Sequence, residues 1–494
     1  MMTIFGKFGL KRLGALALAA AILGAPLAAP IQAHAQAASG APAAASDAAS
    51  SAASSAPAAA PAAAPAAAVN PLDATHDYSK DSVNSGDTAW MITSSVLVLM
   101  MTIPGLALFY GGMVRKKNIL ATLAQSFGAT ALITVLWMVI GYSIAFTGDN
   151  PYIGDLKYIF LAPLNADINL ASPLAPTIPE TVYMFFQMTF AIITPALIAG
   201  ALADRMKYSS FLLFMGAWLL LVYCPVAHWV WSAKGWLGTG GKGALDFAGG
   251  SVVHLNAGTA GLVAALMLGK RKGLGTENMA PHNLAYAVIG ASLLWVGWFG
   301  FNAGSAVESH DGQAGMAAAA TQIATAAAAL SWMFVEWIIS KKPSVLGMIS
   351  GAVAGLVAIT PASGFVNPTG ALFIGLIAGV VCYLSAVHMK KIFGYDDALD
   401  CWGVHGVGGA LGAILTGIFC SNAINSAAPK GDMGAVIAHQ LPLQLLDVGV
   451  VFAYSAIGTF IILAVLKYTI GIRVSEEVEV EGLDINLHGE VVHG

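Results

Sequence analysis

From Trp90 onward, the chain alternates between long apolar stretches and short polar segments. Eleven stretches of about 18 to 25 mostly apolar residues recur. A helix of that length rises about 1.5 Å per residue and crosses a hydrocarbon core of about 30 Å. The pattern therefore predicts an all-α polytopic membrane protein with eleven transmembrane helices. Their predicted limits are 90–112, 119–146, 180–203, 208–231, 247–269, 283–306, 314–339, 344–361, 366–388, 399–420 and 441–471.

Two N-terminal segments are interpreted as lying outside this fold. Residues 1–35 have a basic start, an apolar run and an Ala33-His34-Ala35 sequence, the pattern of a secretory signal peptide cleaved near Ala35. Residues 36–88 are mainly Ala, Pro and Ser and hold little that a core could bury, which favours a disordered tether. The transmembrane domain is then predicted over 89–473 and a cytoplasmic tail over 474–494.

The basic residues of the loops predict the orientation of the spans. Loops on one side of the predicted topology carry thirteen lysines and arginines: Arg115, Lys116, Lys117, Arg205, Lys207, Lys270, Arg271, Lys272, Lys341, Lys342, Lys390, Lys391 and Arg473. The opposite loops carry only Lys157, Lys234, Lys242 and Lys430. Because basic loops stay in the cytoplasm, we expect the N-terminus outside and the C-terminus inside. A cleaved signal peptide independently requires the same odd number of spans.

The spans also resemble one another in two halves. VHLNAGTAG around His254 matches VHGVGGALG around His405, with glycines four and seven residues after each histidine. Spans 1 and 6 share a second pattern, at Gly105, Phe109, Gly112 and at Gly297, Phe301, Gly304. Because five is odd, the second half enters the membrane in the opposite sense, which predicts a five-plus-five inverted repeat. Transporters of this kind place substrate sites near the midplane, between the halves.

Composition agrees with a membrane protein and excludes several other classes. The chain is 57% hydrophobic and only 10% charged, whereas soluble proteins carry about 25% charged residues. A net charge of -4 offers no basic face for nucleic acid. The four cysteines lie far apart without metal or redox spacing, and we interpret them as core residues, with a disulfide as the alternative. No metal ion, cofactor or enzymatic activity is expected.

Two histidines are the main candidates for chemistry. His254 lies near the middle of the fifth span, where a polar side chain is costly and therefore suggests function. His405, its repeat partner, approaches from the inner side. A histidine bonded to a backbone carbonyl is the structural alternative, but two on symmetry-related helices favour a pathway along the axis.

Acidic residues are almost absent from the middles of the spans, which limits what such a pathway could carry. Glu180, Asp204 and Glu336 lie near span ends, where snorkelling to the interface would account for them. The sequence contains no pattern that indicates a ring of carboxylates or a carbonyl filter for hydrated cations. The pathway is therefore expected to be apolar and to suit a small, largely neutral species. Its candidate lining residues are Phe186, Phe190, Trp231, Trp298 and Phe301.

Ordinary packing is the alternative for each of these aromatic residues, because aromatics dominate buried area in membrane bundles. Trp231 also lies at an outer span end, where an aromatic belt would explain it. As the face of a cation site it would contribute about 0.5 to 2 kcal/mol, enough to select a cation without trapping it.

Five motifs resemble the Amt/Mep/Rh family of ammonium transporters, and specifically its bacterial Amt type. They are FYGGMVRKKN (109–118), ALDFAGGSVVH (244–254), WFGFNAGS (298–305), DCWGVHGVGG (400–409) and EGLDINLHGE (481–490). The resemblance covers about residues 85–494. It implies a homotrimer of eleven-helix subunits, each with its own narrow pore, in the bacterial inner membrane and serving nitrogen uptake.

The resemblance also implies roles for individual residues. Phe190, Trp231 and Ser305 match the outer ammonium-recruitment site, with Phe186 close by and Asp246 near it. Phe190 and Phe301 match the stacked phenyl gate, and His254 and His405 match the twin pore histidines. Aromatic faces and the Ser305 hydroxyl would hold NH4+, and loss of a proton would let NH3 pass. Whether the proton follows by a separate route stays open.

The acidic tail from Ser475 is either a solvated end or a regulatory segment. In the family that the chain resembles, the C-terminal region couples the subunits, and bacterial members are blocked by a trimeric P-II signalling protein of the GlnK type. Two rivals come from other classes: an ammonium sensor that binds at Trp231, and a haem-binding redox subunit with His254 and His405 as axial ligands. Only about 20 residues follow Arg473, where a sensor would favour a long signalling domain.

Asp246 and Asp397 share one spacing, because each lies eight residues before a pore histidine. We interpret Asp246 as a helix cap that accepts backbone N–H bonds and offsets the positive field of a helix N-terminus near an incoming cation. On that basis Asp246→Asn is expected to keep much of the fold but to lose activity.

Overall fold

The computed structural model describes residues 83–168 and 170–492. The predicted signal peptide over 1–35 and the predicted tether as far as residue 82 lie outside the described residues. The first helix begins at Ser85, because the side chain of Asn84 accepts hydrogen bonds from the N–H groups of Gly86 and Asp87 and so caps it. Residues 85–88, which the sequence placed in the tether, are therefore helical.

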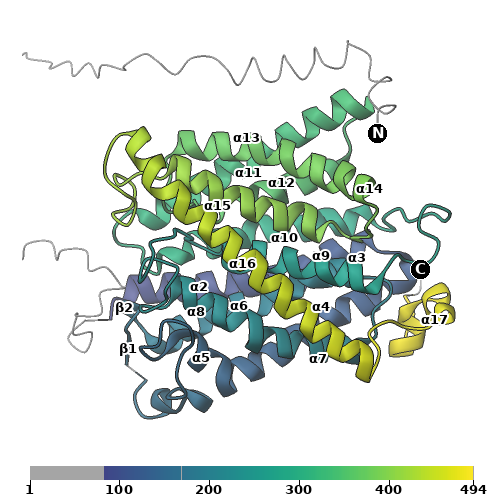
Figure 1. Ribbon diagram of the computed structural model, residues 1–494, viewed down its shortest axis with the longest axis horizontal. Coiled ribbons are helices and arrows are strands. Elements are labelled where there is room, and N and C mark those ends of the chain that lie inside the picture. Colours follow the sequence, from purple (N-terminus) through teal and green to yellow (C-terminus); the bar gives the residue numbers. More distant parts are fainter. Residues whose placement is uncertain (1–82, 169, 493–494) are drawn as a thin grey trace, which may run out of the picture. The chain divides into compact units, whose positions relative to one another are not determined.

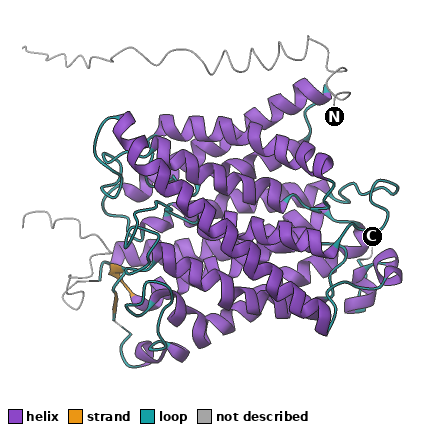
Figure 2. Cartoon of the chain, viewed as in Figure 1, coloured by secondary structure: helices purple, strands orange, loops and turns teal. Residues whose placement is uncertain are grey.

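The described residues are mostly helical (Figure 2). The α-helices are α2 (Ser85–Met100), α3 (Ala107–Met113), α4 (Ile119–Leu136), α5 (Tyr142–Phe146), α6 (Glu180–Leu202), α7 (Tyr208–Trp218), α8 (Cys224–Trp231), α9 (Asn256–Leu268), α10 (Leu284–Asn302), α11 (Gln313–Ser340), α12 (Val345–Ile359), α13 (Pro368–Tyr383), α14 (Lys390–Phe393), α15 (Val407–Phe419), α16 (Met433–Thr469) and α17 (Glu476–Glu481). Two short antiparallel strands, β1 (Ala171–Ser172) and β2 (Ala175–Pro179), lie before α6.

Several of these helices are continued or joined by turns of other helical types. The π-helical turns are η3 (Met101–Leu106), η5 (Trp137–Gly141), η7 (Leu219–Tyr223), η8 (Gly250–Leu255), η10 (Leu384–Met389), η11 (Cys401–Gly406) and η12 (Asp484–His488). The 3-10 turns are η4 (Lys116–Asn118), η6 (Ile159–Asn165) and η9 (Gly304–Ala306). Turns with i to i+5 bonds are rare and often mark functional sites.

Within the described part of the chain, ten helices are long and apolar enough to cross a membrane. Each corresponds to one predicted span, for example Ser85–Met113 to the first and Met433–Thr469 to the last. The eighth predicted span, 344–361, corresponds to α12, which is apolar but only 15 residues long. The polytopic helical architecture is confirmed, and the orientation in the membrane stays a prediction.

The spans that the sequence pairs with one another are in contact. Helices α2 and α3 pack against α10, while η8 and α9 pack against η11 and α15, and α16 runs obliquely across its neighbours (Figure 1). The contact between α3 and α10 requires glycine at position 290, because a Cβ there would lie 2.1 Å from Phe109 N. The related spans of the two halves therefore meet directly.

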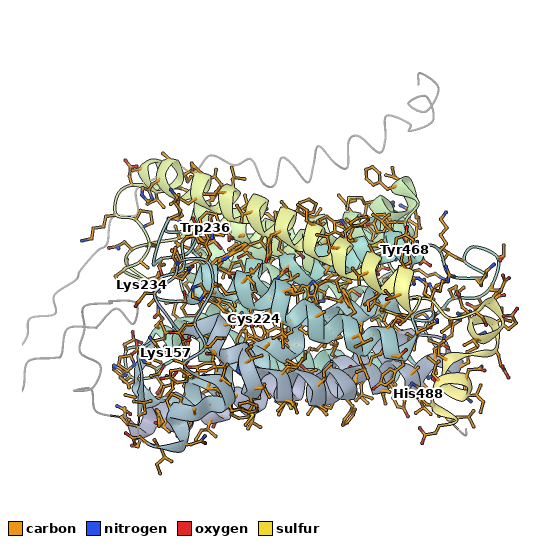
Figure 3. All side chains as sticks on the ribbon, turned by 60° about the horizontal axis from the view of Figure 1, so that its bottom comes forward. Lys157, Cys224, Lys234, Trp236, Tyr468 and His488 are labelled. Atoms are coloured by element: carbon orange, nitrogen blue, oxygen red, sulfur yellow. The ribbon has the colours of Figure 1, made fainter. Side chains whose placement is uncertain are left out.

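The loops predicted to share one side gather at one end of the helices. Arg271 joins Asp204 at 3.3 Å and Asp396 at 2.9 Å, and Arg473 joins Glu479 at 2.7 Å. Figure 3 places Lys157 and Lys234 at one end and Tyr468 and His488 at the other. These ion pairs bring together the loops that carry Asp204, Arg271 and Asp396, while the grouping of all thirteen basic residues on one side stays a prediction.

Snorkelling, expected for Glu180 and Asp204, is wrong for both. Asp204 is 1% exposed and is held by Arg115 as well as by Arg271. Glu180 is 2% exposed and accepts a hydrogen bond from the Tyr142 hydroxyl. Both carboxylates are buried because partners from other segments reach them, which no local pattern reveals.

Candidate functional site

A carboxylate organises the start of the helix that carries His254. Asp246 Oδ1 accepts hydrogen bonds from the N–H groups of Gly249 and Gly250, at 2.9 and 2.6 Å. Its Oδ2 accepts from the N–H groups of Ser251 and Val252, at 2.8 and 3.0 Å, and from the Ser251 hydroxyl at 2.8 Å. Gly249 takes the left-handed conformation, with φ of 114°, which turns the chain into η8. Asp246 therefore caps this helix more fully than a single N-cap bond would.

The helix that carries His405 begins in the same way. Asp397 accepts hydrogen bonds from the N–H groups of Cys401 at 3.0 Å and Trp402 at 2.7 Å, the residues four and five positions later. Asp400 takes the left-handed conformation with φ of 59°, at the place that Gly249 has in the first half. Burial, and then the neighbouring Asp400, raise the pKa of Asp397 to about 6. The shared D-x7-H spacing thus encodes one backbone motif, built twice.

Glycine brings the two motifs together. A Cβ on Gly258, four residues after His254, would lie 2.1 Å from Gly406 N. A Cβ on Gly409, four residues after His405, would lie 2.6 Å from Gly250 O and 3.0 Å from His254 Cβ. The repeated glycines that the sequence displays are therefore needed for close approach of the two histidine-bearing turns.

The two histidines are in direct contact. Their Nδ1 atoms lie 3.3 Å apart, and their ring centroids are 5.4 Å apart with planes 24° from parallel. Because a neutral imidazole has one N–H and one lone pair, one Nδ1 donates to the other and the two tautomers differ. His254 Nε2 is buried without a hydrogen-bond partner among residues 83–168 and 170–492. The pair thus retains a free polar atom for a small polar guest.

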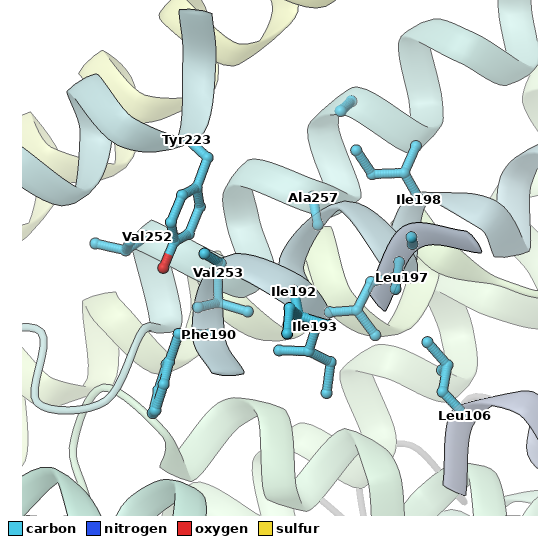
Figure 4. Packing of buried hydrophobic residues seen from close by; sticks show 14 of the residues in the cluster. Leu106, Phe190, Ile192, Ile193, Leu197, Ile198, Tyr223, Val252, Val253 and Ala257 are labelled. Atoms are coloured by element: carbon cyan, nitrogen blue, oxygen red, sulfur yellow. The ribbon is translucent and has the colours of Figure 1, made fainter. Parts of the chain in front are cut away.

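An aromatic row leads to the histidines. The rings of Phe190 and Phe301 are in contact, with centroids 4.3 Å apart and planes tilted by 35°, and the Phe301 ring centroid lies 5.8 Å from that of His254. The Trp298 ring lies 5.2 Å from the same imidazole and donates its Nε1–H to the Thr360 hydroxyl at 2.9 Å. All of these rings are at most 1% exposed, and Figure 4 shows Phe190 within the buried apolar packing. The row is closed to the surrounding solvent.

The other end of the row is partly exposed. The Phe190 ring lies edge to face with Trp231 at 5.7 Å and with Phe186 at 4.9 Å. Trp231 Nε1 donates to the backbone carbonyl of Asp246 at 2.9 Å, and the Ser305 hydroxyl donates to the carbonyl of Phe301 at 2.8 Å. Because its one hydrogen is used, Ser305 Oγ offers only lone pairs to a guest, which suits a cation that donates hydrogen bonds.

The residues predicted as a site therefore form one file, from Trp231 and Ser305 through two phenyl rings to His254 and His405. Beyond the second histidine lies a small cavity lined by Tyr110, Asp400 and His405, among others. In the order of their contacts, the file runs from a part-exposed mouth to a buried imidazole pair.

Comparison with known proteins assigns the chain. The model of the Ammonium Transporter Family matches residues 89–493. The chain belongs to the ammonium transporter family. The resemblance drawn from its motifs is thereby confirmed. An ammonium transporter of Bacillus subtilis is 48% identical over 405 residues, which cover 82% of this chain and 98% of that relative.

Solved structures of this family share the fold. Mep2 of Candida albicans matches with a TM-score of 0.74 and 36% identity, covering 81% of this chain and 89% of that one. A protein described as "Sensor Amt Protein" matches with a TM-score of 0.73 and 28% identity, covering 82% and 98%. These members of the ammonium transporter family support a multi-pass membrane protein, and the curated relatives are transporters rather than enzymes.

One buried carboxylate escaped the sequence analysis. Asp447 lies in the middle of α16 and is 0% exposed, whereas the sequence analysis considered only acidic residues near span ends. Its position in the last predicted span was the available signal. The four cysteines are all buried and free, so the disulfide alternative is wrong.

A polar cluster in the loop after Ser305 was also missed. His310 Nδ1 lies 2.9 Å from Asp87 Oδ2, and the Ser309 N–H donates to Asp87 Oδ1 at 2.8 Å. Asp87, Glu308 and His310 have donor atoms within 4.8 Å of one another. Both Asp87 oxygens are engaged by protein groups, so the cluster holds the loop that follows Ser305 against α2 by hydrogen bonds.

Proposed function

We propose that this protein carries ammonium across the membrane by binding NH4+ at the outer mouth and conducting NH3 past the twin histidines. The observation that carries the proposal is the unbroken file from Trp231 to His405. At one end of the file, Trp231 and Ser305 offer groups suited to a cation. The two phenyl rings that follow exclude ions, and the imidazoles at the other end are neutral polar rings.

Recruitment of NH4+ rests on the part-exposed end of the file. The Trp231 and Phe186 faces attract a cation by about 0.5 to 2 kcal/mol each, and Ser305 Oγ accepts a hydrogen bond from it. The Asp246 carboxylate adds negative charge near this end, although its oxygens already accept five hydrogen bonds. Asp246 therefore acts through its field rather than as a direct ligand.

Loss of a proton follows from the phenyl stack. A full charge between Phe190 and Phe301 would lose its water and gain no hydrogen bond, at a cost of many kcal/mol. NH4+ therefore gives its proton to solvent water at the part-exposed end of the file, and the neutral molecule NH3 avoids that cost. Because the ring centroids are only 4.3 Å apart, the rings must rotate apart for each passage, which makes them a gate.

The histidine pair serves the neutral molecule. NH3 both donates and accepts hydrogen bonds, and imidazoles of opposite tautomer offer one acceptor and one donor along the file. Trp298, tied to Thr360, fixes one wall against the first ring. On leaving the pair, NH3 takes up a proton on the cytoplasmic side.

The haem alternative conflicts with the geometry of the histidines. Axial nitrogens bond an iron from opposite sides at about 2 Å each, with the porphyrin plane between them. Nδ1 atoms 3.3 Å apart on near-parallel rings leave no such space.

We further propose that the protein acts as a homotrimer in the bacterial inner membrane and binds a cytoplasmic P-II protein of the GlnK type. The bilayer environment is supported by apolar residues exposed along the long helices, such as Phe334 (52%) and Phe460 (55%). Native mass spectrometry from detergent would measure the trimer. Co-purification with a GlnK-type protein would test the partner.

The deciding experiment is uptake of labelled methylammonium in cells that lack their own transporters. We expect uptake by the wild type and losses of at least about tenfold for His254→Ala, His405→Ala and Trp231→Leu. Matched controls on exposed helical surface are His439→Ala and Trp337→Leu. Wild-type uptake equal to the empty vector would refute the transport function, and site variants equal to wild type would refute the site.

Binding without uptake would instead support the sensor, for which the "Sensor Amt Protein" neighbour is a structural precedent. Current recordings on reconstituted protein would show whether the released proton also crosses.

A further inference from the structure

A row of polar side chains on α16 runs along the segment that carries Asp246 and His254. Gln440 Nε2 donates to Gly243 O at 2.8 Å, and Gln444 exchanges two hydrogen bonds with the backbone of Leu245, at 2.7 and 2.8 Å. Farther along, Ser455 Oγ donates to Asn256 O at 2.8 Å. Each of these side chains on α16 is thus satisfied by the backbone it faces.

Asp447 is the exception in this row. It is 0% exposed, and neither carboxyl oxygen has a hydrogen-bond partner in the described part of the chain. Of the described residues, the Asp246 carboxylate is a neighbouring charge and the Ser251 hydroxyl a neighbouring polar group, on the turn η8 that α16 packs against. The N–H groups opposite it are unavailable, because those of residues 249–252 already donate to Asp246.

Ser251 determines what Asp447 can do. A serine hydroxyl has one hydrogen, and that of Ser251 is donated to Asp246 Oδ2 at 2.8 Å. Its lone pairs remain, and they accept only from a donor. An ionised Asp447 has no hydrogen to offer and would face a second carboxylate in a dry environment, where an unpaired charge is strongly disfavoured.

We propose that Asp447 holds a proton and donates it in a hydrogen bond to Ser251 Oγ, so that the two carboxyl groups behind the outer mouth carry one negative charge, on Asp246. The chain of bonds runs from the Asp447 O–H to Ser251 Oγ and from the Ser251 O–H to Asp246 Oδ2. Two neighbouring carboxyl groups that share one proton are a known way of separating their roles. Asp447 is here a positioning residue, and its effect on transport rests on the proposed function.

The proton is tested directly by infrared spectroscopy of the full-length protein in lipid nanodiscs. A protonated, buried carboxyl group gives a carbonyl-stretch band that shifts in D2O. We expect this band to be present in the wild type, absent from Asp447→Asn, and shifted in Ser251→Ala, which removes the acceptor. Asp432→Asn, which replaces the exposed N-cap aspartate of the same helix by another capping residue, is expected to keep it. A spectrum in which Asp447→Asn loses no such band would overturn the proposal and would indicate an ionised group, or one neutralised by a bound cation.

Uptake measurements on two variants show whether position 447 needs a hydrogen-bond donor or an ionisable group. Asp447→Leu fills the space without a donor, and we expect methylammonium uptake to fall at least about tenfold, whereas Asp447→Asn keeps a neutral donor and should stay within about threefold of wild type. Uptake abolished by Asn as fully as by Leu would contradict the proposal. If the wild type does not transport at all, the proposed function fails, while the infrared result still decides the proton.

Discussion

The backbone of Gly258 lies directly against the backbone of Gly406, the residue after His405. A Cβ on Gly258 would be 2.1 Å from Gly406 N and 2.3 Å from its Cα, far inside any permitted contact. Neither backbone can yield without moving His254 or His405, because each glycine lies about one helical turn or less from one of them. The spacing of the two imidazoles therefore depends on the absence of a side chain at position 258.

Gly258→Ala is predicted to separate the histidines and to lower methylammonium uptake at least about tenfold, with a loss of stability of about 1 to 3 kcal/mol from overpacking. The matched control is Gly449→Ala in α16, where a Cβ would meet nothing within 4 Å. That change is expected to be neutral or to stabilise by about 0.5 to 1 kcal/mol, because alanine favours a helix interior. Thermal unfolding and uptake would be measured side by side, and equal behaviour of the two variants would contradict the prediction.

Asp246→Asn and Asp397→Asn are predicted to differ in cost. An amide replaces one acceptor oxygen by an NH2 group, which at position 246 would face either the Gly249 and Gly250 donors or those of Ser251 and Val252. Leaving buried donors unpaired costs about 1 to 3 kcal/mol. Asp397 accepts only two such bonds, so its variant should be less destabilised. The sequence alone suggested that Asp246→Asn keeps much of the fold, and the number of bonds now makes a larger loss of stability the expectation.

The free energy of unfolding of each variant against wild type, from thermal melts in one detergent, would measure this difference. Uptake corrected for the amount of folded protein would separate the effect on transport from the effect on stability. Equal melting of the Asp246 and Asp397 variants would show that the extra hydrogen bonds contribute nothing.

The spans and the histidine pair were predictable from sequence for a physical reason. Apolar length reports membrane crossing whatever the packing, and the equal spacing before His254 and His405 reports a motif used twice. The π-helical turns η8 and η11 were not predictable, because hydrophobic periodicity does not record which carbonyl an N–H reaches. Trp298 could be suggested as pore lining, but its hydrogen bond to Thr360 spans 62 residues. Asp447 can be read in the sequence, yet only the fold shows that the N–H groups of residues 249–252 and the Ser251 hydroxyl already donate to Asp246.

The loop after Ser305 is predicted to loosen as pH rises. Burial, and then the neighbouring Asp311, raise the pKa of Glu308 from 4.5 to about 7. Burial opposes a charge on His310, but its hydrogen bond to Asp87 and the attraction of Glu308 outweigh burial and raise its pKa above 6.5. The pKa of Glu308 and that of His310 are both higher in the folded state than in the unfolded state, so both groups stabilise the loop fully at low pH. Glu308 loses that contribution between about pH 4.5 and 7, and His310 loses its own above about 6.5.

Hydrogen exchange of the peptide that covers residues 304–312, corrected for the intrinsic pH dependence, would test this expectation. Protection should fall between about pH 5 and pH 8 in the wild type. Glu308→Gln should remove the lower part of the change, whereas Glu277→Gln, a half-exposed acid at the other end of the helices, should leave the profile as in wild type. Protection that rises with pH would show that the sign is wrong.

The C-terminal tail is predicted to stay docked through Asp484. Helix α4 has no capping bond from its own N-cap residue, Asn118. Asp484 takes that role, accepting from the N–H groups of Leu120 at 3.1 Å and Ala121 at 2.8 Å. Leu483 N–H donates to Asn118 Oδ1 at 2.8 Å beside it.

Replacing a capping carboxylate by alanine costs about 0.5 to 2 kcal/mol, so Asp484→Ala should release the tail about 2- to 30-fold more often. Limited proteolysis would show faster cleavage after Ser475, with Glu490→Ala, an exposed acid of the same tail, cleaved at the wild-type rate. Equal cleavage of all three proteins would mean that the other tail contacts suffice and that Asp484 is not the anchor.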